Sequence, residues 1–481
     1  MAELLLSDVF EGGWQRQHIH TDGRLAEEVH MRVMRRLTLP LLIAISLASC
    51  GTLGTTAPTP APIIIIASPT SAPAQAATAA ATPAEPSPPT IASAVSDATP
   101  ASPPPPSATT APPLPTALPP ATTAPASNMP QIQLSQATLI AIFRGQITSW
   151  ADDRILADNP GTTLPNLPIR VVYRSDPSGT TRAITEYFVQ VDPSWRDTIG
   201  AAYRLGDAGS KPWPTGTGTN GSGQLVKYVK ATPGAIGYVA PSYALSENLP
   251  LAILRNAAGN WVSPASCTLS EAATNTVNNL DNRLRGFIVN APGQNAYPLA
   301  IYTWIIACPA GLTLEQGQAL TDFLYWAITD PQAIAAARQL AYEPLPSTIR
   351  QKAIAQLAAL RIGNQQVFSV PTADQPFTPR HFATQVAING SGATFPNPLY
   401  QELVKRYQQV EPSVALSYNA EGSTQGRADL LQAGIVQFAG SEEAVVDGDS
   451  QITRSVCQPA PLHTPMVVGA VGIVYNLPSG S

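Results

Sequence analysis

A long stretch rich in alanine, proline, threonine and serine sets the first limit on how this chain can fold. It runs from Gly51 to about Asn128 and includes the runs PSPP, ASPPPPS and APPLPTALPP, in a chain with 49 prolines among 481 residues. Such a composition cannot bury a core, and its prolines favour an extended polyproline II conformation. We therefore assign residues 51–130 as a disordered linker and expect the folded part to begin near Gln131.

The segment before this linker has the layout of an export signal. From Met31 or Met34 the chain runs MRRLTLPLLIAISLASCG, in which arginines precede an apolar run and small residues precede Cys50. That run is too short for a membrane-spanning helix, which needs about 20 apolar residues. LASC, ending at Cys50, resembles a bacterial lipobox, which implies cleavage before Cys50 and its lipidation. A plain secretory signal with an incidental cysteine is the alternative. We expect residues 1–50 to be a leader and lipoprotein signal peptide, with translation starting at Met31 or Met34.

The overall charge and composition exclude some classes of protein. A net charge of −5 argues against a nucleic-acid binder that depends on phosphate neutralisation. It does not exclude a small anionic ligand, because such a site needs only local positive potential. With 44% hydrophobic and 12% charged residues, the remainder of the chain fits a globular protein of two or three domains.

Three turns rich in glycine, serine and threonine stand before helical patterns. The first, YRSDPSGTTR at Tyr173–Arg182, follows a strand-like IRVV and adds a guanidinium and a carboxylate; the others are GSGATF and EGSTQG. A planar Arg fork suits two oxygens of a tetrahedral anion, and N–H groups at a helix start add positive potential. Taken alone, the first turn is as well explained by an ordinary N-cap. The agreement of three turns favours an oxyanion site.

Five separate stretches together resemble the PstS family, the phosphate-binding receptors of bacterial ABC phosphate importers. They are YRSDPSGT, PGAIGYV (Pro233–Val239), GSGATFPNPLY (Gly390–Tyr400), EGSTQG (Glu421–Gly426) and VQFAGSE (Val436–Glu442). The resemblance spans roughly residues 131–360 and 386–478. It implies an α/β fold of two lobes, the type II periplasmic-binding-protein fold, with the ligand between the lobes. We expect residues 131–295 to form the first lobe and residues 296–481 the second.

The order of these stretches differs from that of the family. The segment that comes first in the family lies here at 386–481, and we interpret this as a circular permutation with the new joint at residues 361–385. Permutation is tolerated where the original termini lie close together on the surface. A truncated pair of tandem copies and an exchange between two chains are the alternatives. We expect Val467–Leu477 to pair beside Pro298–Cys308 as a chain end.

The resemblance carries the family's phosphate contacts over to matching positions here. The groups that would donate to phosphate oxygens belong to Arg174, Ser178, Gly179, Thr180, Thr394, Phe395 (through its backbone N–H) and Ser423. Asp176 would orient Arg174 through a salt bridge. The family's carboxylate that accepts the proton of phosphate is normally Asp; here it is Glu442, or Glu443 takes part. Sulfate offers no such proton, which explains its rejection in the family, and the longer Glu442 puts the strength of that rejection in question.

The resemblance implies an exported, monomeric receptor that binds inorganic phosphate and delivers it to an ABC permease, with no enzymatic activity, cofactor or metal. Its lipid anchor would hold it on the outer face of the cytoplasmic membrane. One alternative is a receptor or sensor for another oxyanion. Another is a secreted phosphohydrolase with Ser178 or Thr180 as nucleophile. The hydrolase has little support, because the folded region's histidines, His381 and His463, lie in no motif and no metal-ligand cluster is present.

Three cysteines follow Cys50 in the chain, at Cys267, Cys308 and Cys457. In an exported protein two of them can form a disulfide. We favour a bond between Cys267 and Cys308, with free buried thiols as the alternative.

Overall fold

The structure is a computed structural model that describes residues 129–201, 212–445, 457 and 460–478. The predicted leader, Cys50 and nearly all of the predicted linker lie outside these residues. No described helix combines the length and the apolar character that a membrane crossing requires.

Several helices of the described chain begin at a side-chain cap that the sequence supplies. Ser135 accepts from the Thr138 N–H at the start of α2, and Thr313 and Gln316 form a capping box at the start of α8. The helices are α2 (Gln136–Phe143), α3 (Asp153–Asp158), α4 (Gly179–Val191), α5 (Gly221–Ala231), α6 (Pro241–Ser246), α7 (Ser266–Asn275), α8 (Leu314–Thr329), α9 (Pro331–Gln339), α10 (Ser347–Ala359), α11 (Asn397–Val410) and α12 (Ser423–Ala428).

A six-stranded sheet is built around β7 (Ala300–Ala307), whose residues are all buried as its apolar sequence predicts. The strand order is β12-β11-β13-β7-β14-β8. Strand β11 runs parallel to β12 and β13, whereas β7 is antiparallel to β13 and β14. The other strands are β8 (Glu343–Pro344), β11 (Val386–Gly392), β12 (Val414–Ala420), β13 (Phe438–Ser441) and β14 (Leu462–Ala470).

A four-stranded sheet has the order β15-β4-β2-β3. Its strands are β2 (Arg170–Arg174), β3 (Thr217–Thr219), β4 (Ala235–Val239) and β15 (Gly472–Tyr475). Strand β2 is parallel to β3 and β4, so it delivers the turn that follows it to the start of α4. Smaller sheets join β1 (Gln133–Leu134), β5 (Ile253–Arg255) and β6 (Trp261–Val262), and pair β9 (Arg361–Ile362) with β10 (Gln365–Gln366).

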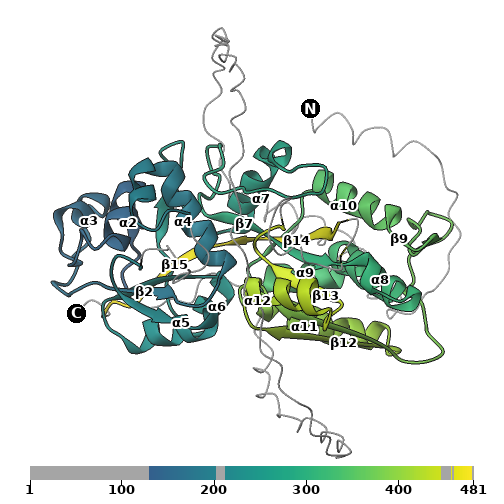
Figure 1. Cartoon of the computed structure of the whole chain (residues 1–481). Helices are drawn as coiled ribbons and strands as arrows, with labels where there is room; N and C mark the ends of the chain where they lie inside the picture. Colours follow the sequence, from purple (N-terminus) through teal and green to yellow (C-terminus); the bar gives the residue numbers. More distant parts are fainter. Residues whose placement is uncertain (1–128, 202–211, 446–456, 458–459, 479–481) are drawn as a thin grey trace, which may run out of the picture. The chain divides into compact units, whose positions relative to one another are not determined.

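The last two strands of the described chain connect these two main sheets. Strand β14 pairs antiparallel with β7, so the pairing expected for Val467–Leu477 is confirmed for its first part, Val467–Ala470. The expectation is wrong for the rest of that stretch, because β15 pairs antiparallel with β4 instead. The chain therefore passes from one sheet to the other at Val471, and Figure 1 shows the yellow β14 and β15 among elements from earlier in the chain. The Tyr475 hydroxyl donates to the Pro130 carbonyl at 2.6 Å and accepts from the Ile132 N–H at 3.1 Å. Strand β15 thus holds the first described residues of the chain in place.

The predicted division between lobes at residues 295 and 296 stays a prediction. Helix α7, which precedes it in sequence, packs against β7, β8 and β14 of the six-stranded sheet. Strand β15, which follows it, belongs to the four-stranded sheet.

The predicted disulfide between Cys267 and Cys308 is wrong. Cys308 is bonded to Cys457, with their Cα atoms 5.1 Å apart. The reason lies in strand register: Ala307 at the end of β7 pairs with Leu462 at the start of β14. This pairing brings the segment that precedes β14, which contains Cys457, close to Cys308 at the end of β7. The two cysteines are 149 residues apart, and spacing along the sequence cannot reveal that they meet.

The connecting strand should be a major source of stability. Ile473 in β15 is fully buried, whereas Ile435 is 64% exposed. We expect Ile473→Ala to lower the free energy of unfolding by about 2–5 kcal/mol, because it removes buried methyl groups and leaves a cavity. The matched control Ile435→Ala should change it by less than about 0.5 kcal/mol. Denaturant titration measures both, and equal effects would show that β15 contributes no core packing.

Candidate functional site

The end of β2 presents a buried guanidinium group. Arg174 is 2% exposed, and its Nε donates to Asp176 Oδ1 at 2.6 Å while a second nitrogen contacts the other carboxylate oxygen. Its Nη1 donates to Ser222 Oγ at 3.1 Å. Burial alone would raise the pKa of Asp176, but the hydrogen bond and charge of Arg174 lower it below its ordinary value. The salt bridge predicted for Asp176 is present and fixes the direction of the guanidinium.

The first turn of α4 contacts residues from the C-terminal part of the chain. Ser178 caps the helix by accepting from the Thr181 N–H at 3.3 Å, so the ordinary N-cap interpretation also holds. The Gly179 N–H donates to Ser423 Oγ at 3.3 Å, and Thr180 Oγ1 donates to Glu442 Oε2 at 3.4 Å. The helix start therefore lies directly against α12 and the end of β13.

Only glycine fits at position 179 in this arrangement. A Cβ atom there would lie 2.8 Å from Glu442 Oε2 and 2.9 Å from Ser423 Oγ. Gly422 has a φ of +108°, and a Cβ there would lie 2.9 Å from the Pro177 carbonyl oxygen. These two glycines let the backbones of the two segments approach closely.

Glu442 follows β13 and is buried, with 3% of its surface exposed. Its Oε2 accepts from Ser423 Oγ at 3.0 Å, whereas its Oε1 has no hydrogen-bond partner among the described protein atoms. Burial raises the pKa of Glu442 to about 7, although Arg174, Ser423 and Thr180 favour the charged form. The carboxyl group can therefore change its protonation near neutral pH.

The turn after β11 joins this cluster through its threonine. Thr394 Oγ1 accepts from the Ser222 N–H at 3.2 Å and lies 3.1 Å from Ser222 Oγ. Phe395 is fully buried, with its ring against Tyr342. The eight predicted ligand-contacting residues thus come from one turn on the four-stranded sheet side and three on the six-stranded side. We call the residues linked here the polar cluster: Arg174, Asp176, Ser178, Gly179, Thr180, Ser222, Thr394, Phe395, Ser423 and Glu442.

Three tyrosines support the turn after β11 and were not predicted from sequence. Tyr418 donates to the Ala393 carbonyl at 2.8 Å, Tyr243 to that of Thr394 at 2.5 Å, and Tyr342 to that of Phe395 at 2.7 Å. They come from β12, α6 and the segment before β8, so no local pattern marks them. Ser222 was also missed. The sequence signal that could have found it is the glycine-rich start of α5.

Glu443 lies apart from the polar cluster. Its carboxylate accepts from Arg427 Nη1 at 3.0 Å and lies 3.6 Å from Arg182 Nε. Of the two adjacent carboxylates, Glu442 is therefore the one that faces the donors of the cluster.

The polar cluster gathers hydroxyl, N–H and guanidinium donors. Of its two carboxylates, Asp176 is paired with Arg174, whereas Glu442 accepts only from hydroxyl groups among the described residues. This suits an oxyanion that carries a proton. Within the described residues no group of His, Cys, Asp and Glu side chains is arranged to hold a metal ion. The described histidines also lie elsewhere: His381 bonds Glu411 at 3.0 Å, and His463 Nε2 accepts from the Val445 N–H at 3.0 Å. Neither is placed to activate Ser178 or Thr180.

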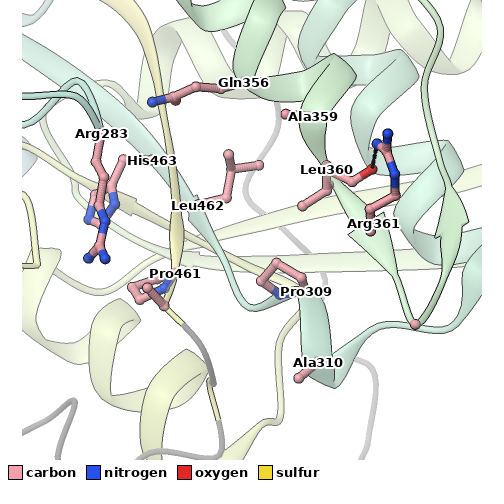
Figure 2. Close-up of a pocket in the computed structure, with 12 residues that line it drawn as sticks. Arg283, Pro309, Ala310, Gln356, Ala359, Leu360, Arg361, Pro461, Leu462 and His463 are labelled. Atoms are coloured by element: carbon pink, nitrogen blue, oxygen red, sulfur yellow. Dashed lines mark hydrogen bonds between the residues drawn. The ribbon is translucent and has the colours of Figure 1, made fainter.

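A cavity of about 600 Å³ lies away from the polar cluster and shares none of its residues. Figure 2 shows Arg283 and His463 on one side of it and Arg361 on the other. His463 is 1% exposed, and its burial, with the charge of Arg285, lowers its pKa to about 3. The imidazole is therefore neutral at physiological pH, and it supports the backbone of Val445.

Glu442 should make stability depend on pH. Its folded-state pKa of about 7 lies above its ordinary value of 4.5, so the folded chain binds more protons between these pH values. The stability that this group contributes is fully present below pH 4.5 and is lost as the pH rises through 7. In the wild type, Glu442 should lower the free energy of unfolding by about 2–3 kcal/mol as the pH rises over this range. We expect Glu442→Gln to lack this decrease.

The measurement is denaturant unfolding of both proteins, without added anions, at several pH values from 4.5 to 8. Asp322, whose burial raises its pKa to about 6, and Glu343 add slopes of the same sign. Subtracting the variant's curve from that of the wild type isolates Glu442. Parallel curves would mean that its pKa is not raised.

Comparison with known proteins places the chain in a family. A model of the PBP superfamily domain matches residues 117–331. A phosphate-binding protein PstS of Pasteurella multocida is 35% identical over 239 residues, covering 49% of this chain and 67% of that protein. A PstS of Xylella fastidiosa (strain Temecula1) is 33% identical over 219 residues, covering 46% of this chain and 58% of that protein. The chain thus spans somewhat more than half of the Xylella protein.

Among solved structures, a phosphate-binding protein of a phosphate ABC transporter from Streptococcus pneumoniae TIGR4 is similar, with a TM-score of 0.36 and 16% identity. The match covers 64% of this chain and 88% of that chain. On the sequence identity that it shares with PstS proteins over as much as two thirds of their length, this chain belongs to the PstS family of phosphate-binding proteins.

Proposed function

We propose that this protein binds inorganic phosphate at the polar cluster and delivers it to the permease of an ABC importer. The observation that carries the proposal is Glu442, a buried carboxylate surrounded by donors from both main sheets. The relatives named above are phosphate-binding proteins, which supports the same ligand. The permease partner rests on the family alone.

Phosphate fits the chemistry of this cluster. At neutral pH it carries a proton and several oxygens that accept hydrogen bonds. Arg174, Ser178, Gly179, Thr180, Thr394, Phe395 and Ser423 supply the donors for those oxygens. The proton on phosphate donates to Glu442, whose Oε1 has no hydrogen-bond partner among the described residues. Asp176 orients Arg174 by the salt bridge described above.

Binding brings the two main sheets together around the anion. Donors reach the ligand from the starts of α4 and α12, which belong to different parts of the fold. A ligand that bonds both sides stabilises the arrangement in which they are close, which is a hinge closure coupled to binding.

The order of elements is explained by a circular permutation, which we propose for residues 386–481. Strands β11 to β15 complete the sheets that contain β7 and β4 of the same chain. The end of β15 lies against the start of the folded part through the bonds of Tyr475 with Pro130 and Ile132. A direct join between these two points would restore the family order, and residues 361–385 would be the added joint.

We propose that the protein is a monomeric, non-enzymatic receptor anchored outside the cytoplasmic membrane through Cys50, which lies outside the described residues. Lipidation should be visible as incorporation of labelled palmitate by cells expressing the wild type. Cys50→Ser should abolish this label and release the protein into the soluble exported fraction. Equal labelling of both proteins would exclude Cys50 as the anchor.

Anion selectivity should depend on the protonation of Glu442. Ionised Glu442 repels sulfate, which has no proton to donate, whereas protonated Glu442 can donate to it. With a pKa of about 7, we expect sulfate to bind about tenfold or more tightly at pH 5.5 than at pH 8.5, while phosphate binds well at both. Glu442→Gln should bind sulfate equally at both pH values. Equilibrium binding of phosphate, arsenate and sulfate measures these affinities.

Two outcomes would contradict the proposal. Equal affinity of the wild type for sulfate and phosphate at pH 8.5 would remove the role of Glu442 as proton acceptor. Turnover of a phosphate ester that is lost on Ser178→Ala or Thr180→Ala would favour the hydrolase instead.

A further inference from the structure

Glu443 contacts an arginine on each side of the polar cluster. Its Oε2 accepts from Arg427 Nη1 at 3.0 Å, and its Oε1 lies 3.6 Å from Arg182 Nε. Arg427 is on α12, which packs against β11 and β13 of the six-stranded sheet. Arg182 is on α4, which follows β2 of the four-stranded sheet. One carboxylate therefore uses a different oxygen for each side of the molecule.

Glu443 is held in place by its own side of the molecule. Its N–H donates to Ser441 Oγ at 3.0 Å, and the Ser441 hydroxyl donates to the Glu443 carbonyl at 2.6 Å. Arg427 is 1% exposed and also donates to that carbonyl at 3.3 Å. These bonds position the carboxylate whether or not Arg182 is present, so the contact with Arg182 is the part that joins the two sides.

Arg182 is likewise positioned in advance by its own surroundings. Its Nη1 donates to Glu186 at 2.7 Å, one turn further along α4, and to the Ala201 carbonyl at 3.1 Å. Its guanidinium lies 5.1 Å from the centre of the Phe287 ring. The Arg182 and Glu443 side chains are both ordered before they meet, so they lose little conformational entropy on pairing. This entropy loss therefore does not offset their electrostatic attraction.

We infer that Glu443 and Arg182 are positioning residues that hold the two main sheets together around the bound anion and slow its release. The inference rests on the proposed function. Glu442 faces the polar cluster, whereas Glu443 faces Arg182 further along α4, so the adjacent carboxylates have separate roles. Because the ion pair joins the two sides, it stabilises the arrangement in which they are close. Its loss should therefore act mainly on the dissociation rate.

The contact is only partly shielded from water. The side chains of Arg182 and Glu443 are 20% and 16% exposed, so salt should weaken their attraction. This distinguishes the pair from the buried bonds that Glu442 and Gly179 make in the polar cluster, which salt should affect much less.

The test is the rate of phosphate release, measured by stopped flow after mixing with a phosphate trap. Arg182→Gln leaves Glu443 bonded to Arg427 and should raise the dissociation rate about two- to fivefold. Arg182→Lys, which keeps the charge, should recover part of this effect. The matched control Glu186→Gln removes the other carboxylate partner of Arg182 and should leave the rate unchanged. Thermal unfolding of each variant checks that the fold is retained.

Salt provides a second readout. Raising NaCl from about 50 to 500 mM should accelerate release from the wild type toward the rate of Arg182→Gln, while the variant changes little. If Arg182→Gln does not fold, Arg182→Lys and the salt dependence of the wild type decide the matter.

Two results would overturn this inference and leave the proposed function intact. One is phosphate release at the same rate from the wild type and Arg182→Gln. The other is a dissociation rate in Glu186→Gln raised as much as in Arg182→Gln. Release from the wild type that is insensitive to salt would also count against it. Absence of phosphate binding by the wild type would instead overturn the proposed function, and the inference with it.

Discussion

The burial of one carboxylate between two sheets is the constraint on which the rest of the site depends. An ionised group removed from water is costly unless donors and opposite charge surround it. Glu442 receives hydroxyl bonds from Ser423 on its own side and from Thr180 on the other, with Arg174 near enough to favour its charge. These interactions do not fully offset burial, which is why its pKa remains above the ordinary value. An additional hydrogen-bond donor beside Glu442 would therefore lower the cost of keeping its carboxylate ionised.

This arrangement requires the backbones on the two sides to approach within contact distance. Gly179 and Gly422 make the approach possible, because a Cβ at either position would overlap atoms of the opposite segment. The turn after β11 is held from behind by the hydroxyls of Tyr243, Tyr342 and Tyr418. The donors of the cluster are thus fixed by close packing and by buried hydrogen bonds, which preserves their directions before a ligand arrives.

The sequence predicted the parts of the site that are local in the chain. A turn such as Tyr173–Arg182 contains its guanidinium, its carboxylate and its helix start within ten residues, and the structure places these groups as expected. Features that depend on tertiary packing were not predictable. The bond of Cys308 with Cys457 follows from the register of β7 and β14, and the tyrosines behind Thr394 come from three distant elements. The choice between Glu442 and Glu443 likewise depends on which side chain faces the donors of the polar cluster, and the sequence alone left both open.

The separation of the site residues along the chain explains how one site can survive a different order of elements. Thr180 and Glu442 are 262 residues apart, yet closing a flexible loop of that length costs little more than closing one half as long. The site requires that β2 and β13 keep their places in their sheets. Strand β13 pairs with β7, which pairs with β14; the chain then continues into β15, which pairs with β4 beside β2. If the permutation placed the ends of the folded part at Tyr475 and Pro130, which are in contact, all of these pairings would stay intact. Under the proposed permutation, chain order would therefore affect the folding route more than the geometry at Glu442.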